Sequence, residues 1–176
     1  MSTYPSSAAA VAAEKRIRAV VASKAPVAQK LETLVRIVEE LTPSGMVASI
    51  LLLDRDGRHL RHGAAPSLPS AYNAAIDGLE MGPEEGSCGT AAFQGKTVAV
   101  YDIENDPLWA NYKDLALAHG LRACWSTPIR GVEGRVLGTF ANYYRVVRDP
   151  GPADVALTST VTIAAAVVIE SVDVSA

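Results

Sequence analysis

The spacing of apolar residues predicts two helices in the first part of the chain. Residues 8–24 have a helix-forming composition, and Pro26 marks a break after them. In residues 28–41 the apolar side chains recur every three or four positions, as they do on one face of a helix. They are Leu31, Leu34, Val35, Val38 and Leu41. The segment "TPSG" at 42–45 supplies the proline and the glycine that end this helix.

Apolar runs and turn residues predict two antiparallel hairpins. Residues 46–54, "MVASILLLD", indicate a mostly buried strand, and an Asp-Gly turn leads from it into a second strand at 59–65. A later pair of strands is predicted at 122–131 and 135–144, joined across "GVEGR". These pairings indicate an antiparallel sheet built from one hairpin early in the chain and one hairpin late in the chain.

The segments between and after the hairpins add helices and one more strand. We expect a short helix within 66–79, a turn or short helix at 87–93, a strand at 97–102 and a helix that ends at Gly120. Prolines at the start of residues 149–174 favour one long final helix. Helices on both faces of an antiparallel sheet make an α+β fold.

Composition narrows the classes of function. A chain of 176 residues with 49% hydrophobic residues fits one domain with a core of ordinary size. A net charge of −3 gives no nucleic-acid footprint, and two cysteines do not make a disulfide framework. We therefore expect a cytoplasmic protein with no nucleic-acid partner. We place an N-terminal tail and helix at 1–25, the main domain with its C-terminal helix at 26–172, and a tail at 173–176.

No segment predicts secretion or a membrane span. The N-terminus lacks the apolar stretch of a secretory signal. The longest apolar run, 155–169, is interrupted by threonine and serine and is shorter than the roughly 20 residues that a span needs. We expect no membrane partner.

The stretch "GSCGTA" at 86–91 is the first candidate for chemistry. Gly86 and Gly89 allow a tight turn around Cys88, and Thr90 can stabilise a helix start. A thiol at a helix N-terminus has a lowered pKa, which favours a reactive thiolate. A small, half-buried side chain beside a pocket is the simpler interpretation of Cys88, and a redox or ligand-contacting role is the alternative.

Four motifs in order resemble the GAF domain, closest to the sensor modules of bacterial histidine kinases and cyclic-di-GMP enzymes. They are the G-x-C-G-T-A turn at 86–91, V-x-D-I at 100–103, "WSTPI" at 125–129 and "LGTF" at 137–140. The resemblance covers residues 31–170. It implies an antiparallel sheet of about six strands with a ligand pocket on one face. It also implies long terminal helices on the other face that form a bundle, dimerise and pass a signal onward.

Strand alternation and the resemblance together define a candidate pocket. Alternation puts Cys124 and Ser126 on one face of the sheet, with Trp125 on the other as core beneath the terminal helices. Substrate-side positions of the family fall on Cys124, Ala141 and Tyr143, which predicts a small, weakly polar and uncharged pocket. The candidate ligand-binding residues are Cys88, Thr90, Asp102, Trp109, Tyr112, Cys124, Ser126, Ala141 and Tyr143.

Two of these candidates carry further expectations. Asp102 ends its strand, so we favour a role in capping the following loop over contact with a ligand. Trp109 and Tyr112 are candidates for a lid. We expect an uncharged or weakly polar small molecule over Cys124 and Tyr143, and its identity does not follow from the sequence. A dimerisation scaffold with an empty pocket is the rival hypothesis.

The motifs of several specialised members of the family do not match this chain in full. Free methionine-R-sulfoxide reductases use a second cysteine in the region that corresponds to 105–120, where this chain has none, and three acidic residues that here are Cys124, Ala141 and Tyr143. Bilin-binding members attach the chromophore through a cysteine commonly followed by histidine, which neither cysteine matches. The N-K-x-F-D-E pattern of cyclic-nucleotide-binding members is absent.

Haem and metal chemistry have little support in the sequence. Haem would need an axial ligand, and the histidines are His59, His62 and His119, of which His119 is the best placed. No paired cysteine or histidine spacing indicates a metal site. We therefore predict no catalytic residue and no metal, and we name no cofactor.

The terminal helices predict a homodimer. A stripe close to the coiled-coil repeat runs along the final helix through Leu157, Val161, Ala164, Val168 and Val172. The first helix adds a further apolar edge at Ile17, Val20 and Val21, which a single sheet has little room to bury. We expect the surplus to be buried against a second copy, with a histidine kinase, PAS or GGDEF module as the output partner. Cys88 and Cys124 are expected at the same end of the pocket.

Overall fold

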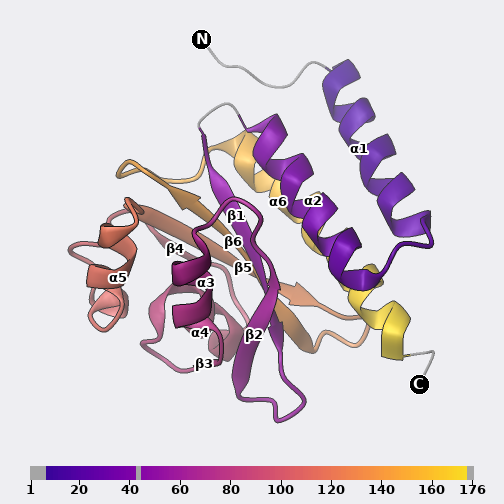
Figure 1. The fold of residues 1–176 in the computed structure, drawn as a ribbon. Helices are drawn as coiled ribbons and strands as arrows, with labels where there is room; N and C mark the ends of the chain where they lie inside the picture. Colours follow the sequence, from indigo (N-terminus) through magenta and orange to yellow (C-terminus); the bar gives the residue numbers. More distant parts are fainter. Residues whose placement is uncertain (1–6, 43–44, 174–176) are drawn as a thin grey trace.

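A six-stranded antiparallel sheet forms the centre of the fold, with the strands in the order β3-β2-β1-β6-β5-β4 (Figure 1). The structure is a computed structural model that describes residues 7–42 and 45–173. The strands are β1 (Val47–Leu53), β2 (His59–Ala64), β3 (Leu79–Glu80), β4 (Val98–Val100), β5 (Ala123–Arg130) and β6 (Val136–Tyr144). The helices are α1 (Ser7–Ala22), α2 (Val27–Leu41), α3 (Ser70–Ile76), α4 (Gly86–Gln94), the 3-10 turn η1 (Pro107–Trp109), α5 (Lys113–Ala118) and α6 (Pro152–Asp173).

The two predicted hairpins meet in the middle of the sheet, where β1 pairs with β6. Gly138 makes that pairing possible, because a Cβ atom there would lie 2.1 Å from the carbonyl oxygen of Leu51. Any side chain at this position would push the two hairpins apart. The predicted α+β fold with an antiparallel sheet of about six strands is therefore confirmed.

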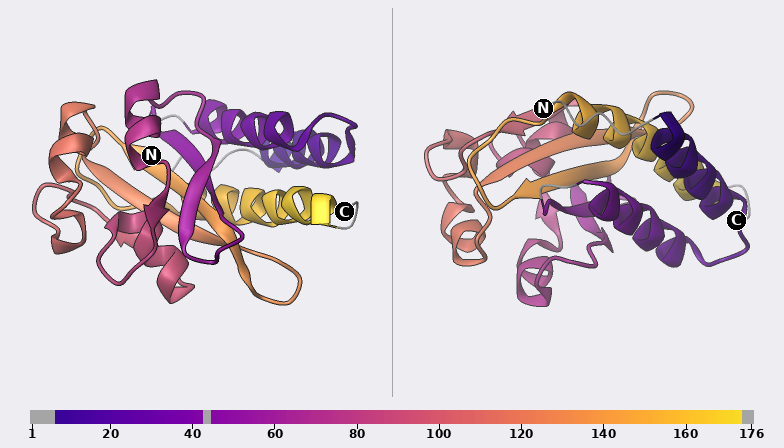
Figure 2. Two further views of the ribbon diagram at one scale, coloured as in Figure 1. Left: turned by 60° about the horizontal axis from the view of Figure 1, so that its bottom comes forward. Right: turned by 90° about the horizontal axis from the view of Figure 1, so that it is seen from above.

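The helices form two groups on opposite faces of the sheet. Figures 1 and 2 show α1, α2 and α6 together on one face and α3, α4 and α5 on the other. The core is divided in the same way. Ile50, Phe140 and Tyr144 pack with the terminal helices, whereas Leu51, Cys124 and Tyr143 pack with the short helices. The predicted alternation of Ala123 and Cys124 between the two faces is confirmed.

The terminal helices bury their apolar stripes within the chain. Ile17 of α1 is 4% exposed, and Val20 and Val21 pack against the same core. Val161 and Val168 of the α6 stripe are almost fully buried against the same core, whereas Val172 at the end of that stripe is 49% exposed. The expectation that the sheet has little room for Ile17, Val20 and Val21 is therefore wrong, because these residues pack within the chain.

A different face of α6 points to solvent. The apolar residues on it are Val155, Ile163 and Val167, and Ile163 is 66% exposed. Among the helices of residues 7–42 and 45–173, α6 alone is long and apolar enough to cross a membrane, with a mean hydropathy of 1.9 over Pro152–Val172. The core helix of a folded domain passes the same test, and the inner face of α6 lies on the sheet.

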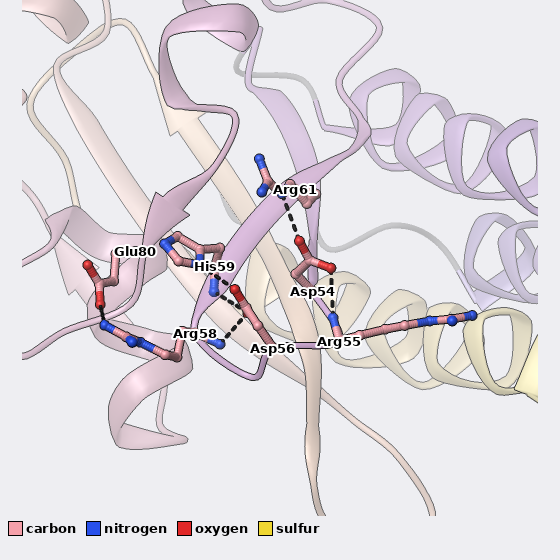
Figure 3. A network of polar contacts seen from close by, with 7 residues as sticks. All are labelled: Asp54, Arg55, Asp56, Arg58, His59, Arg61 and Glu80. Carbon is pink, nitrogen blue, oxygen red and sulfur yellow. Dashed lines mark hydrogen bonds and ion pairs between the residues drawn. The ribbon is translucent and has the colours of Figure 1, made fainter.

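Charged residues organise the turn between β1 and β2 (Figure 3). Asp56 accepts hydrogen bonds from the backbone N–H groups of Arg58 and His59, at 2.8 and 3.0 Å, and its carboxylate also pairs with the His59 ring. Arg58 reaches Glu80 on β3. These contacts on the exposed hairpin connect β2 to the two-residue strand β3, which the sequence prediction missed.

Candidate functional site

The candidate site lies between the sheet and the first turn of α4, on the face opposite the terminal helices. Gly86 opens α4 with a φ of +60°, a conformation that side chains rarely adopt. A Cβ on Gly89 would lie 2.6 Å from the Cβ of Glu85, so this turn needs glycine as well. The backbone can therefore bring Ser87 and Cys88 down onto the sheet.

Trp109 and Tyr112 hold the segment around η1 against this turn. The Trp109 Nε1–H donates to Ser87 Oγ at 3.1 Å, and Ser87 Oγ donates to the carbonyl oxygen of Cys124, also at 3.1 Å. The Tyr112 hydroxyl donates to the Glu85 carboxylate. Burial and this negative neighbour raise the pKa of Tyr112 to about 12, which keeps the phenol protonated as a donor. Both side chains thus line the pocket, and we refer to them below as the lid, which stays a prediction.

A narrow pocket remains beneath the lid. Its lining residues are Tyr72, Ile76, Leu79, Glu85, Gly86, Ser87, Cys88, Trp109, Tyr112 and Tyr143. Its volume of about 20 Å³ is enough for a single water-sized molecule. A larger ligand therefore has to displace Trp109 or Tyr112. The hydrogen bond that each of these side chains donates opposes that displacement.

The floor of the site combines two thiols with aromatic hydroxyls. Cys88 Sγ lies 3.9 Å from the Tyr143 hydroxyl, and Tyr143 stands opposite Cys124 in the pairing of β5 with β6. Tyr72 donates to the Tyr143 hydroxyl at 3.4 Å, with its ring edge-on to the Tyr143 ring. Burial raises the pKa of Tyr72 and of Tyr143, so both phenols remain neutral.

Several buried hydroxyls on this face of the sheet lack a hydrogen bond of ordinary geometry. Ser49, Ser126 and Thr139 are at most 1% exposed. Ser49 and Ser126 stand on either side of Ala141 in the strand pairing, and Thr139 lies two positions before Ala141 on β6. An unsatisfied buried hydroxyl costs about 1–3 kcal/mol. A molecule that reached this floor with a hydrogen-bonding group would offset part of that cost.

The structure separates the predicted site residues into those that line the pocket, those that are buried without lining it, and those that stabilise the nearby backbone. Cys88, Trp109, Tyr112 and Tyr143 line the pocket. Cys124, Ser126 and Ala141 are buried and do not line it.

Thr90 and Asp102 stabilise the local backbone. Thr90 Oγ1 accepts the Glu85 N–H at 3.1 Å, and Asp102 accepts the Glu104 N–H and the Asn105 side-chain amide. Asp102 therefore has the capping role that was favoured for it.

Sequence reasoning missed several pocket residues. Tyr72 comes from α3, whose pattern gave no reason to place it over β6. Glu85 precedes the glycine turn, and its carboxylate lines the pocket, so the expectation of an uncharged pocket is wrong at the rim. The glycine on each side of Cys88 was the available signal, because a turn that tight brings the preceding residue into the site as well.

The histidines have structural neighbours. His59 pairs with Asp56, and the His119 ring packs edge-on against Tyr72 with 5.7 Å between ring centroids. Among the described residues, no group of three or more His, Cys, Asp or Glu side chains is arranged to hold a metal ion.

Comparison with known families gives a match over most of the chain. The GAF domain model matches residues 24–170. The chain is also 36% identical over 162 residues to the methyl sulfide methyltransferase-associated sensor of Methanosarcina acetivorans. That match covers 92% of this chain and 16% of the archaeal protein, so the chain spans about a sixth of that relative's length.

Solved structures share the fold at low identity. The GAF domain of a phosphoenolpyruvate-protein phosphotransferase from Coxiella burnetii superimposes with a TM-score of 0.77 at 18% identity, covering 94% of this chain and 95% of that chain. The free methionine-R-sulfoxide reductase of Neisseria meningitidis, in complex with its substrate, gives 0.73 at 17% identity, covering 100% and 97%. The same fold therefore occurs both in the GAF domain of a phosphotransferase and in a free methionine-R-sulfoxide reductase.

Proposed function

The chain belongs to the GAF domain family, and on that premise we propose that it is a cytoplasmic sensory module in signal transduction. It binds a small molecule in the pocket beneath α4 and passes the signal to its terminal helices. The similarity to a protein named as a sensor supports the sensory role.

The observation that carries the proposal is the position of β6 between the pocket and α6. Tyr143 lines the pocket, and its two neighbours in the chain point to the other side of the sheet. The Asn142 amide donates to Thr158 Oγ1 on α6 at 2.9 Å, and the Tyr144 hydroxyl contacts Asp154 at 3.2 Å. A shift of Tyr143 therefore moves two residues that hold the final helix. Small displacements between packed elements are an established way to carry such signals.

The ligand is a small, weakly polar molecule. It enters by displacing the lid, and it reaches the floor formed by Cys124, Ser126, Ala141 and Tyr143. There the hydroxyls of the floor supply its polar contacts. Glu85 at the rim favours a ligand with a hydrogen-bond donor at its outer end. A donor from the ligand can then replace the Tyr112 hydroxyl on this carboxylate.

The output side is a homodimer built from the terminal helices. The face of α6 that points outward has no charged residue between Val155 and Val167, although every large side chain on it is about half exposed or more. An uncharged helix face of this length is suited to a second copy. A histidine kinase, PAS or GGDEF module joined to the helices would receive the signal.

Two rival functions lead to different results. This chain lacks the second cysteine of the reductases and has neutral residues at their acidic positions. We therefore expect no reduction of free methionine-R-sulfoxide in the presence of dithiothreitol. The scaffold hypothesis requires a pocket that never opens. The closed pocket of about 20 Å³ is compatible with that hypothesis as long as the lid stays in place.

Native mass spectrometry of the intact chain isolated from cells tests the proposal. We expect a bound species that is lost on denaturation and is identified in the released fraction. Gly86→Ala serves as a matched variant, because it strains the turn that shapes the pocket, and Gly134→Ala strains a distant turn of similar φ. Loss of the bound species in the first variant alone supports the pocket. Protein that carries nothing, and binds nothing from a cell extract, favours the scaffold.

A further inference from the structure

Two buried thiols lie together at the floor of the pocket, and their own reactivity is not used by the proposed binding of a ligand. Cys88 is 5% exposed on α4 and Cys124 is fully buried on β5, and both are free. The bond from Ser87 Oγ to the carbonyl oxygen of Cys124 fixes the first turn of α4 over β5. Tyr143 lies opposite Cys124 and contacts the Cys88 sulfur. Both cysteines belong to the same buried cluster between the sheet and the short helices, and the Cys124 thiol is the main neighbour that lowers the pKa of Cys88.

The surroundings of the two sulfur atoms differ in a way that assigns them different roles. The Cys124 thiol and the hydroxyls of Ser126, Tyr143 and Thr139 surround the Cys88 sulfur and lower the pKa of Cys88. The position of Cys88 in the first turn of α4 acts in the same direction. Burial and the neighbouring sulfur raise the pKa of Cys124. Cys88 is therefore the nucleophile of the pair, and Cys124 remains a protonated thiol beside it.

Access to the pair is selective for size. Cys88 lines the pocket and Cys124 does not. The closed pocket, at about 20 Å³, accepts a molecule close to water in size. Hydrogen peroxide is close to this limit, whereas a bulky organic peroxide or a glutathione-sized disulfide requires the lid to open.

We propose that Cys88 and Cys124 form a peroxide-reactive site whose product is an intramolecular disulfide. In the first step the Cys88 thiolate attacks one oxygen of hydrogen peroxide. The S–O bond forms as the O–O bond breaks, and the departing hydroxide takes up a proton to become water. Cys88 is oxidised to the sulfenic acid and the peroxide is reduced.

Cys124 completes the reaction. Its thiol gives up a proton and its sulfur attacks the sulfenic sulfur, so that the S–S bond forms as the S–O bond breaks. The hydroxide that leaves takes up the proton as a second water molecule. One peroxide and two thiols thus give one disulfide and two waters. The disulfide joins α4 to β5 across the pocket floor, and its formation requires no ligand in the pocket.

The experiment uses the intact, reduced chain at pH 7 with hydrogen peroxide, followed by alkylation under denaturing conditions and mass spectrometry. We expect both cysteines to lose their reactivity together, the protein to lose two hydrogen atoms, and a peptide map to show Cys88 joined to Cys124. Dithiothreitol should reverse the change. Tert-butyl hydroperoxide should leave both thiols free over the same time. This measurement needs no variant.

Matched variants then assign the roles. Cys124→Ser should stop at a sulfenic acid on Cys88 that dimedone traps, and Cys88→Ser should leave Cys124 free. Thr139→Val removes a hydroxyl beside Cys88, so the pKa of Cys88 should rise and the thiolate fraction at pH 7 should fall. The oxidation rate should fall with that fraction. Thr127→Val removes a buried hydroxyl on the opposite face of the sheet, away from Cys88, and should leave the rate unchanged.

Several results would overturn the proposal. Two thiols that stay free in peroxide, a disulfide that links two chains, or a sulfenic acid that forms first on Cys124 would each do so. Equal rates for Thr139→Val and Thr127→Val would remove the assigned role of the hydroxyls.

Discussion

Replacement of Trp109 by alanine tests whether this side chain fills and closes the pocket. Trp109 is 3% exposed, and its ring lines the pocket while its N–H donates to Ser87. A buried tryptophan replaced by alanine typically costs about 3–5 kcal/mol. The segment around η1 is short and can partly collapse, so we expect a loss near the lower limit, about 3 kcal/mol of unfolding free energy. The hydrogen bond to Ser87 accounts for about 1 kcal/mol of it.

Denaturant unfolding of three proteins separates these contributions. Trp109→Phe keeps an aromatic ring in the pocket but loses the N–H donor, so its free energy of unfolding should fall by about 1–2 kcal/mol. Trp109→Ala should also gain an apolar cavity that binds free indole, as engineered cavities bind small aromatic molecules. Indole at ten times its dissociation constant should restore about 1.4 kcal/mol to Trp109→Ala and nothing to the wild type.

A loss of less than 1 kcal/mol in Trp109→Ala, with no stabilisation by indole, would contradict this reasoning. It would mean that the ring does not fill the site in solution. The lid would then be open, and the pocket would be larger than the structure gives.

Further predictions concern the sheet, the hairpin and the dimer. Asn142→Ala should lose about 1–3 kcal/mol in thermal or denaturant unfolding, because it leaves a buried hydroxyl on α6 without its partner. The His59 side chain and two backbone N–H groups lower the pKa of Asp56 from 3.8 to about 2. Its stabilisation is therefore present above the unfolded value and lost as the pH falls towards 2, and Asp56→Asn should remove that part of the acid dependence of the melting temperature. Light scattering should give about twice the 18.5 kDa monomer mass, Ile163→Glu should give the monomer, and Phe93→Glu on the opposite face should not.

The strand pattern was readable from the sequence because alternation is a local property. It placed Cys124 and Ala123 on opposite faces of the sheet, and the structure agrees. The strand at Leu79–Glu80 was not readable, since two residues carry no period. It is held in the sheet by partners distant in sequence, including the pair between Arg58 and Glu80.

The choice of partner for each helix face was beyond the sequence. An apolar stripe shows that a face is buried and does not show what covers it. For this reason the apolar edge at Ile17, Val20 and Val21 was assigned to a dimer, although it packs against this chain's own core. The sequence predicted only part of the candidate site, for a related reason. Cys88 and Tyr143 follow from the motifs, whereas Glu85 enters the pocket through the positive φ of Gly86, which is a property of the folded turn.

Hydrogen exchange tests most directly the claim that pocket occupancy is passed to α6. The comparison is between the protein as isolated from cells, shown by native mass spectrometry to carry a bound species, and the same protein after the species has been removed by unfolding and refolding. We predict that removal speeds exchange in η1 and α4 and also in the stretch of α6 around Thr158, with the hairpin of β1 and β2 unchanged. A change confined to the pocket segments, with α6 exchanging equally in both samples, would contradict the account.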